Sequence, residues 1–495
     1  MSDHDQPTTV GPLPNTTSQS SLAPRTFTRL VWALWLASLV VLAGRLVDST
    51  AWTLPGVVAI DGLTVVMWVA VTFFSGIVHS YSRRYLAGSQ HVDRFFSRVF
   101  AFTLVVMLLV AADHVVLFGA AWLAMGLLMA DLIGYVDGWP QAQAAAAVAR
   151  RYFVASSALL AVALGTLSWA TGETAVSGIV ASVTAVPTAL WLVAAGALLL
   201  AAMIQSALVP FHTWLLSSMT APTPASALMH AGFVNAGGVL LLRFAPVVSV
   251  DPTFMLAVVV VGAISALSGK LLKSVQSDVK GQLGCSTVGQ MGFMIMQAGL
   301  GFFGAALTHL VLHGFYKAYQ FLASGERVEQ TSPTAERETH SLGGGGLLAT
   351  ALTALAGGAV FAGLTGKGTT LDTGLLLTAL VVLTTLHATR EAVVRTGLSA
   401  TVRFGAVPLV FLPAIAVYAL AYRLVTHLLA GLPVVTAATE LTPVHGVVAA
   451  AFLLAYLAVE SGVYRQRPRL YVALLNAAQP SSNTVLTSTE EYNEY

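Results

Sequence analysis

The chain has 495 residues, of which 56% are hydrophobic and 9% are charged, and its formal net charge at pH 7 is +2. Soluble domains carry about 25% charged residues, so this composition excludes a soluble globular protein. The single cysteine, Cys285, excludes an internal disulfide framework and any zinc or iron–sulfur site built on cysteines.

The N-terminal 26 residues are rich in Ser, Thr, Pro and Asp, and they lack the basic segment and apolar core of a signal peptide. We expect residues 1–26 to form a disordered cytoplasmic tail. Apolar runs of about 20 residues then recur along almost the whole chain, as in polytopic helical membrane proteins. The sequence therefore predicts an all-α transmembrane domain over residues 27–465 and a cytoplasmic C-terminal tail over residues 466–495.

In chain order, the hydropathy pattern predicts about 14 transmembrane helices. They lie near residues 28–47, 55–79, 95–112, 114–135, 152–171, 187–209, 223–247, 253–273, 281–299, 302–323, 345–364, 371–389, 405–428 and 444–463. With both termini on one side of the membrane, four of the 24 Lys and Arg residues fall at the opposite face, Lys317 falls inside a span, and the remaining 19 fall at the face of the termini. Because short cytoplasmic loops concentrate Lys and Arg, this asymmetry supports the count and predicts cytoplasmic termini.

No soluble domain is predicted between the spans, because the longest polar connection, residues 324–344, is a loop. The sequence contains no Gly-rich nucleotide loop, no dinucleotide-binding fingerprint and no haem-type cysteine pair. We therefore expect a transporter subunit and not an enzyme, with no catalytic motif, metal or cofactor of its own. Its energy would come from an ion gradient or from another subunit.

The span near residues 302–323 contains the stretch HLVLHGFYKA, which places His309, His313 and Lys317 four residues apart on one helix face. An ionisable side chain inside a membrane is costly, so it usually faces a wet cavity or a partner and marks a pathway. Because histidine titrates near neutral pH and a desolvated lysine shifts toward it, we predict that the row passes protons. Two alternatives are weaker. In the first, the three groups only form hydrogen bonds that join neighbouring helices. In the second, they bind a metal ion, but His-x3-His supplies just two ligands and lysine is a poor third.

Two other segments carry polar groups at membrane depth. Residues 209–238 contain three prolines and place His230 inside a span, which is typical of the broken helices that form ion sites in transporters. An ordinary re-entrant turn or kink is the alternative. Asp278 and Lys280 begin a later span and fit a solvated helix end equally well. Asp61 and His79, on the second span, are further candidates for lining the predicted proton pathway.

Several long motifs occur in the order of a known family. They begin with IDGLTVVMWVAVTFFSGIVHSYSRRYL and continue with FHTWLLSSMTAPTPASALMHAGFVNAGG, VQSDVKGQLGCSTVGQMGFMIM and HLVLHGFYKAYQFLASG. From about residue 55 to 330 the chain resembles the antiporter-like membrane subunits of respiratory complex I and of multisubunit Na+/H+ antiporters. The resemblance implies an inverted-repeat fold with discontinuous helices. Asp278 matches the acidic residue of the family's TDIKR-like motif. The residues that the resemblance implies on the family's central proton axis are His230, Lys280, His309, His313 and Lys317.

Two positions depart from the family pattern. Where the family usually has Trp-Glu, this chain reads AAWLAMG, so Leu123 replaces the glutamate. Gln205 lies where the family usually has a lysine, five residues before a proline. The Glu–Lys pair that is thought to drive charge movement in these antiporters is therefore missing. Candidates to replace it are Asp131, Asp113 and His114.

A third branch of the family fits better. The HAGFVNAGG segment and the ending YRQRPRLYVALLNA resemble the membrane subunit of DAB-type inorganic-carbon transport complexes. This resemblance implies a bacterial inner-membrane protein that conducts a cation, namely protons, to drive conversion of CO2 to bicarbonate. The implied partner is a large, soluble, zinc-containing, carbonic-anhydrase-like subunit of the DabA type on the cytoplasmic side; membrane lipid also contacts the chain, and no nucleic acid is expected. The alternatives are a subunit of a proton-pumping NADH:quinone oxidoreductase or multisubunit Na+/H+ antiporter, or an inert helical scaffold.

Overall fold

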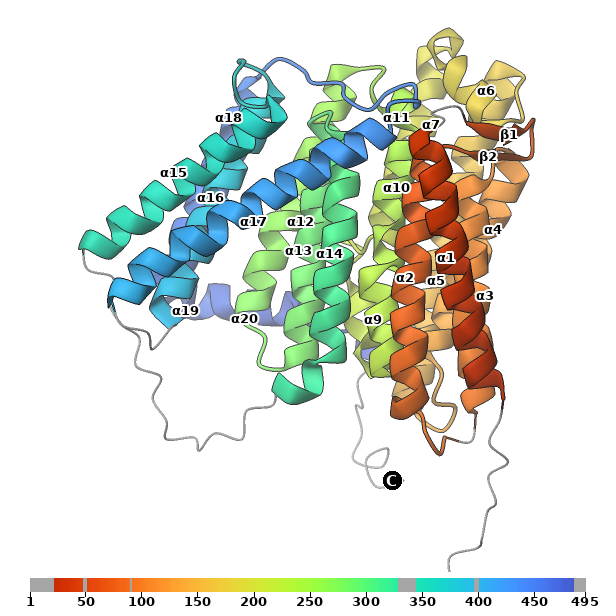
Figure 1. Ribbon diagram of the computed structural model, residues 1–495, viewed down its shortest axis with the longest axis horizontal. Coiled ribbons are helices and arrows are strands. Elements are labelled where there is room, and N and C mark those ends of the chain that lie inside the picture. The colour runs from red at the N-terminus through yellow and green to blue at the C-terminus, as the bar shows by residue number, and fades with distance from the viewer. Residues whose placement is uncertain (1–21, 48–50, 90, 328–343, 396–399, 485–495) are drawn as a thin grey trace, which may run out of the picture.

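The computed structural model describes residues 22–47, 51–89, 91–327, 344–395 and 400–484. Long helices run side by side and form an all-α bundle (Figure 1). Helix α1 begins at the lower end of this bundle in the view of Figure 1, and helix α20 lies across the same end. We call this the terminal end. An even number of membrane crossings between α1 and α20 accounts for this arrangement.

The N-terminal part of the chain forms five long helices and one short hairpin. They are α1 (Ala23–Val47), β1 (Trp52–Leu54), β2 (Val58–Ile60), α2 (Gly62–Tyr85), α3 (Val92–Ala111), α4 (Val115–Ile133) and α5 (Pro140–Thr171). The strands pair antiparallel, with Trp52 opposite Ile60, at the end of the bundle away from the terminal end (Figure 1). Asp61 then caps α2, because its side chain accepts a hydrogen bond from the backbone N–H of Thr64 at 2.9 Å. The expected tail boundary at residue 26 falls inside α1.

Residues 176–248 form a series of shorter helices. They are α6 (Val176–Ala181), η1 (Val183–Ala185), α7 (Thr188–Gln205), α8 (Thr213–Ser217), η2 (Ser218–Thr220), α9 (Thr223–Ala231), η3 (Phe233–Asn235), α10 (Ala236–Arg243) and α11 (Ala245–Val248). Helix α9 begins directly after Pro222, since proline is tolerated at the start of a helix and not in its interior. A 3-10 turn then separates α9 from α10. The prediction of discontinuous helices in this region is confirmed.

The C-terminal part contains the remaining elements. They are α12 (Pro252–Ser274), α13 (Val279–Gly299), α14 (Phe303–Leu322), η4 (Ser324–Arg327), α15 (Gly344–Thr365), α16 (Thr373–Arg395), α17 (Ala400–Leu428), α18 (Pro443–Ser461), α19 (Val463–Gln466), α20 (Pro468–Ala477) and η5 (Ser482–Thr484). Helices α12 and α13 pack unusually closely, because a Cβ at Gly262 or Gly269 would overlap the backbone of α13. This contact holds the middle of α13, around Gly289 and Gly292, against α12.

Every one of the 14 expected spans coincides with a long helix or, for residues 223–247, with the broken pair α9–α10. Twelve helices in the described residues are long and apolar enough to cross a membrane. Helices α13 and α14 have 21 and 20 residues, and they are not among the twelve because they are more polar. They lie in the middle of the bundle (Figure 1), and one face of α14 remains exposed at Phe315 and Tyr316. The most polar spans are therefore the central ones.

Helix α20 lies within the range that the sequence predicts as a C-terminal tail. Its last carbonyl, Ala477 O, lies 3.0 Å from Nε2 of His212, and Gln276 Nε2 donates to Ala478 O at 3.2 Å. The backbone N–H of Ser481 donates to the Ser217 hydroxyl at 2.9 Å. The chain beyond α18 is therefore packed against α8 and against the connection between α12 and α13.

Candidate functional site

The predicted row on α14 faces the interior of the bundle. His313 is 6% exposed and Lys317 is fully buried, whereas the neighbouring Phe315 and Tyr316 are 47% and 53% exposed. Successive positions along the helix thus divide into a buried polar stripe and an outward apolar face. The rings of His309 and His313 lie nearly parallel, with their centroids 5.8 Å apart. Both ring nitrogens of His313 are buried, and no described residue bonds to either of them.

Lys317 is joined to a neighbouring helix through a backbone oxygen. Its Nζ donates to the carbonyl of Leu283 on α13 at 2.8 Å. The hydroxyl of Thr287, also on α13, donates to the same carbonyl at 2.9 Å. This hydroxyl has used its proton, so its oxygen accepts from Nδ1 of His230, 2.9 Å away. The arrangement assigns the Nδ1–H tautomer to neutral His230 and connects α9, α13 and α14 in one network.

His230 is the second predicted residue that the structure places beside the row. It is fully buried, and its ring stacks on Phe321 of α14 with 4.2 Å between centroids. Its other nitrogen, Nε2, is buried and has no hydrogen-bonding partner among the described residues. The break in the chain follows directly after α9. A histidine at the end of this short helix therefore lies near the Lys317 end of the row.

Lys280 and Asp278 have different positions at the start of α13. Lys280 is half-buried, and its Nζ donates to the carbonyls of Met219 and Ala221 at 3.3 and 3.1 Å. These carbonyls belong to the connection between α8 and α9, so Lys280 ties the broken segment to α13. Asp278 is exposed and caps α13 by accepting from Gly281 N–H at 2.6 Å. A solvated helix end was one of the two interpretations of this pair from the sequence. The exposed, capping position of Asp278 agrees with that interpretation.

The two predicted residues of α2 bond away from the row. The Asp61 carboxylate pairs with the Arg243 guanidinium at the end of α10 and also accepts from Thr64. Burial raises the pKa of the Asp61 carboxyl, whereas the charge and hydrogen bonds of Arg243 and the hydrogen bonds of Thr64 lower it. The result is a pKa of Asp61 below its ordinary value. His79 Nδ1 lies 2.8 Å from the carbonyl oxygen of Ser75 on its own helix. The structure thus brings neither of them into the Lys317 network.

The three candidates for replacing the missing pair also bond elsewhere. Asp131 pairs at 3.0 Å with Arg150 and at 3.4 Å with Arg98, and its side chain is 38% exposed. Asp113 accepts from the backbone N–H and the hydroxyl of Ser177, both at 2.8 Å. His114 caps α4. These contacts account for the local structure at the helix ends, and none of them reaches α14.

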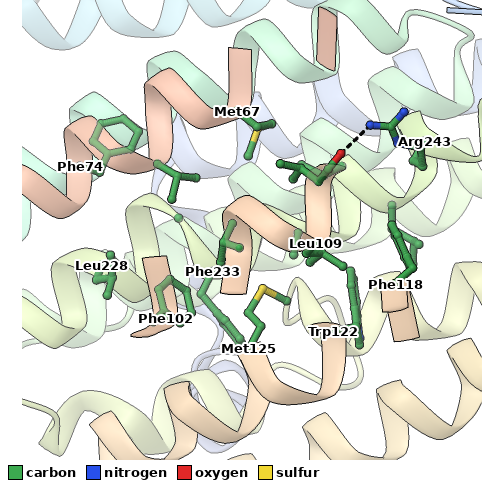
Figure 2. A pocket seen from close by; sticks show the side chains of 17 residues that line it. Met67, Phe74, Phe102, Leu109, Phe118, Trp122, Met125, Leu228, Phe233 and Arg243 are labelled. Carbon is green, nitrogen blue, oxygen red and sulfur yellow. Dashed lines mark hydrogen bonds between the residues drawn. The ribbon is translucent and has the colours of Figure 1, made fainter. Parts of the chain in front are cut away.

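The interior beside Trp122 is apolar (Figure 2). A pocket of about 30 Å³ lies there, and of the described residues that line it Arg243 alone is charged. The guanidinium of Arg243 donates to Val110 O at 2.8 Å, as the dashed line in Figure 2 shows. Leu123 is partly exposed and does not line this pocket. Gln205 is fully buried, and neither atom of its amide finds a partner among the described residues.

Sequence reasoning missed a second ionisable cluster, at the terminal end. Lys270 Nζ on α12 lies 2.6 Å from Nε2 of His387 on α16. Nδ1 of the same ring lies 2.7 Å from a carboxylate oxygen of Glu460 on α18. Arg390 donates to the other oxygen of Glu460 at 2.7 Å. The available signal was the spacing of His387 and Arg390, three residues apart on one helix face. Among the described residues, no group of three or more His, Cys, Asp or Glu side chains is arranged to hold a metal ion.

Two family profiles match this chain. The family profile described as NADH:quinone oxidoreductase/Mrp antiporter, TM, matches residues 112–401. The profile described as NADH-ubiquinone oxidoreductase (complex I), chain 5 N-terminus, matches residues 48–96. Together they include the broken segment, the network around Lys317 and all of α16.

Curated relatives are similar over a little more than half of this chain. The probable inorganic carbon transporter subunit DabB1 of Halothiobacillus neapolitanus is 38% identical over 56% of this chain and 51% of its own length. The probable inorganic carbon transporter subunit DabB of Bacillus subtilis is 37% identical over 62% and 60%. The NADH-quinone oxidoreductase subunit L of Mycobacterium tuberculosis is 38% identical over 54% and 42%. The chain thus spans about half the length of the curated relatives it matches.

Solved structures share the fold over nearly the whole chain. The Mrp complex of Dietzia sp. DQ12-45-1b is similar with a TM-score of 0.57 and 24% identity, over 92% of this chain and 50% of that one. An archaeal membrane-bound sulfane sulfur reductase is similar with a TM-score of 0.58 and 16% identity, over 94% of both chains. The antiporter-like fold expected from the sequence is confirmed.

Proposed function

The chain belongs to the family of NADH:quinone oxidoreductase and Mrp antiporter membrane subunits, and on this premise we propose that it is the proton-conducting subunit of an inorganic-carbon pump. The observation that carries the proposal is the network around one carbonyl of α13, that of Leu283. Lys317 of α14 donates to this carbonyl, and so does Thr287, whose hydroxyl in turn bonds His230 of α9. Buried ionisable groups of this kind are expensive in a membrane and mark ion pathways.

Within the proposed pathway, Lys317 is the station that carries charge. Its ammonium is stabilised by the Leu283 carbonyl, which accepts a hydrogen bond and carries no proton itself. Transfer onward to His313 or His230 therefore passes through water or through rotation of the lysine side chain. We infer that a bridging water joins His309 to His313, whose ring centroids lie 5.8 Å apart.

The finer assignment to inorganic carbon rests on two supports. Relatives from Halothiobacillus neapolitanus and Bacillus subtilis are named as inorganic carbon transporter subunits. In addition, Leu123 and Gln205 occupy the positions of the family's charged pair, so this chain departs from ordinary antiporter subunits. We assign catalysis to a soluble, zinc-containing, carbonic-anhydrase-like partner at the terminal end, which we place on the cytoplasmic side of a bacterial inner membrane.

A second function is favoured by one observation. The NADH-quinone oxidoreductase subunit L of Mycobacterium tuberculosis is as similar to this chain, at 38% identity, as the Halothiobacillus neapolitanus relative. A role in a quinone-reducing or Na+/H+ antiporter assembly would use the same buried row. It would have to work without the glutamate at position 123 and the lysine at position 205.

Co-purification separates these two functions. The complex is extracted from its native membrane in mild detergent, its subunits are identified by mass spectrometry and its zinc is measured. We expect one large zinc-containing partner that resembles a carbonic anhydrase. Quinone-reductase or antiporter subunits in place of this partner would overturn the inorganic-carbon assignment and leave the ion pathway in place.

A further inference from the structure

We propose that Lys270, His387, Glu460 and Arg390 form an ionisable gate on a second water route. This route connects the His309 end of the buried row with the terminal end of the bundle. The inference rests on the proposed conduction of protons and adds a place where they enter or leave. The four residues come from α12, α16 and α18. Helix α12 packs against α13, which belongs to the network around Lys317, and α18 packs against both α12 and α16.

We assign the protons of the cluster in a way that its hydrogen bonds permit. The Lys270 ammonium donates to Nε2 of His387, whose Nδ1–H donates to Glu460, and Arg390 donates to the second oxygen of the same carboxylate. A proton crosses when an N–H bond of Lys270 breaks as Nε2–H forms, while Nδ1–H breaks as O–H forms on Glu460. The net change is one proton moved from Lys270 to Glu460, and the imidazole is again neutral. Net conduction then requires Glu460 to release this proton into the second cavity and Lys270 to take up another from the first, while the imidazole returns to its Nδ1–H tautomer.

Two cavities meet at this cluster. The first, of about 560 Å³, is lined by Gln297 and His309 at its inner part and by Lys270 and His387 at its outer part. The second, of about 500 Å³, is lined by Lys270 and His387 as well, and it extends to Arg465 beyond α18. Because both cavities share Lys270 and His387, a proton that passes between them meets these two side chains.

The inner end of the first cavity offers polar atoms that are ready to bond water. Gln297 is 1% exposed, and its Oε1 has no hydrogen-bonding partner among the described residues. Nε2 of His309 is buried without such a partner as well. Both residues line the cavity. Water in the cavity would satisfy these atoms and join His309 to the outer cluster, since buried polar groups are normally hydrogen-bonded.

A purely structural cluster would need fewer groups. The Arg390–Glu460 pair alone joins α16 to α18, with side chains 29% and 17% exposed. His387 extends the hydrogen bonds to a third helix through a lysine that also lines both cavities. The position of the imidazole between an amine and a carboxylate is the arrangement that proton transfer requires.

Water access can be measured with single cysteines, because Cys285 is the only native cysteine and is fully buried. In a Cys285→Ala background, Thr384→Cys and Ser286→Cys each place a thiol on the lining of the first cavity. Leu409→Cys, at a position 76% exposed on α17, is the lipid-facing control. The whole complex in closed vesicles of each orientation is treated with a membrane-impermeant cationic thiol reagent.

We expect both cavity thiols to react when the terminal end faces the reagent and the Leu409→Cys thiol to stay unmodified. Cavity thiols that react no faster than the lipid-facing control would show a lipid-filled cleft and overturn the inference. Inorganic-carbon uptake by variants is the second measurement. His387→Phe is expected to lower inorganic-carbon uptake about tenfold or more with the partner still bound. The matched control is His427→Phe, at an exposed position on α17.

Failure of the gate and failure of the proposed function have different signatures. Full uptake in His387→Phe together with loss of uptake in Lys317→Ala would overturn the gate and leave the function standing. Full uptake in Lys317→Ala would overturn the proposed proton pathway itself, whatever His387→Phe does. Loss of the partner from His387→Phe in co-purification would show that His387 holds the helices together, and this result also overturns the gate.

Discussion

Lys317 on α14 and Thr287 on α13 donate hydrogen bonds to the same carbonyl oxygen, that of Leu283, at 2.8 and 2.9 Å. A helix interior carbonyl already accepts from the backbone four residues later, so this oxygen is unusually rich in donors. The local field of the carbonyl stabilises a positive charge on Lys317, while Thr287 extends the contact to His230. One backbone atom therefore places an ammonium and an imidazole from two different helices in the same network.

Replacement of Lys317 tests this network directly. Lys317→Met keeps much of the side-chain volume and removes the charge, and Lys317→Ala removes both. We expect either variant to abolish inorganic-carbon uptake while the partner still co-purifies, because Leu283 O keeps its bond from Thr287. The matched control is Tyr316→Phe on the exposed face of α14. Uptake close to the wild-type level in Lys317→Met would contradict a charge-carrying role.

Thr287 is expected to matter through one hydrogen bond. Thr287→Val keeps the shape of the side chain but leaves the buried Nδ1–H of His230 without its acceptor, at a cost of about 1–3 kcal/mol. The purified complex should unfold at a lower temperature and transport more slowly. Thr287→Ser keeps the hydroxyl and should behave as the wild type. Equal melting temperatures for the valine and serine variants would rule out this bond as a support of the site.

The ion pair of Asp61 and Arg243 is expected to be structural. Their side chains are each 11% exposed, and removal of one partner leaves the other charge poorly solvated, at a cost of about 3–5 kcal/mol. Asp61→Asn should lower the melting temperature of the purified complex, and protein that remains folded should keep its uptake per molecule. A folded Asp61→Asn variant without uptake would instead return Asp61 to the ion route that the sequence predicts.

Substitutions at Gln205 test whether this position can still hold the lysine that the family usually has there. Gln205→Lys places an ammonium in a fully buried position where, among the described residues, even the amide has no partner. We expect a loss of several kcal/mol and little assembled complex. Gln205→Leu has a similar volume and buries no polar atom, so it should assemble normally. Both amounts can be compared by size-exclusion chromatography of the solubilised membranes, and normal assembly of the lysine variant would show that a compensating charge or water reaches this site.

The sequence by itself determined the membrane class, the positions of the spans and the inward row on α14. Each of these depends on residues that are close in the chain: an apolar run of about 20 residues is long enough to cross the bilayer, and a spacing of four places side chains on one helix face. For the same reason the start of α9 was predictable, because Pro222 acts on its own neighbours, whereas the 3-10 turn between α9 and α10 contains no proline.

The tertiary structure alone decided which ionisable groups meet. The sequence predicts Asp61 on the proton route, but its partner is a residue 182 positions later. The sequence offers Asp131 as a replacement for the missing pair, but its carboxylate bonds Arg150 at a partly exposed position. His387 gains its partners from α12 and α18, 117 and 73 residues away. A periodic pattern specifies the face of a helix that turns inward. The neighbour that this face meets depends on how the helices pack, as where Gly262 and Gly269 let α12 approach α13.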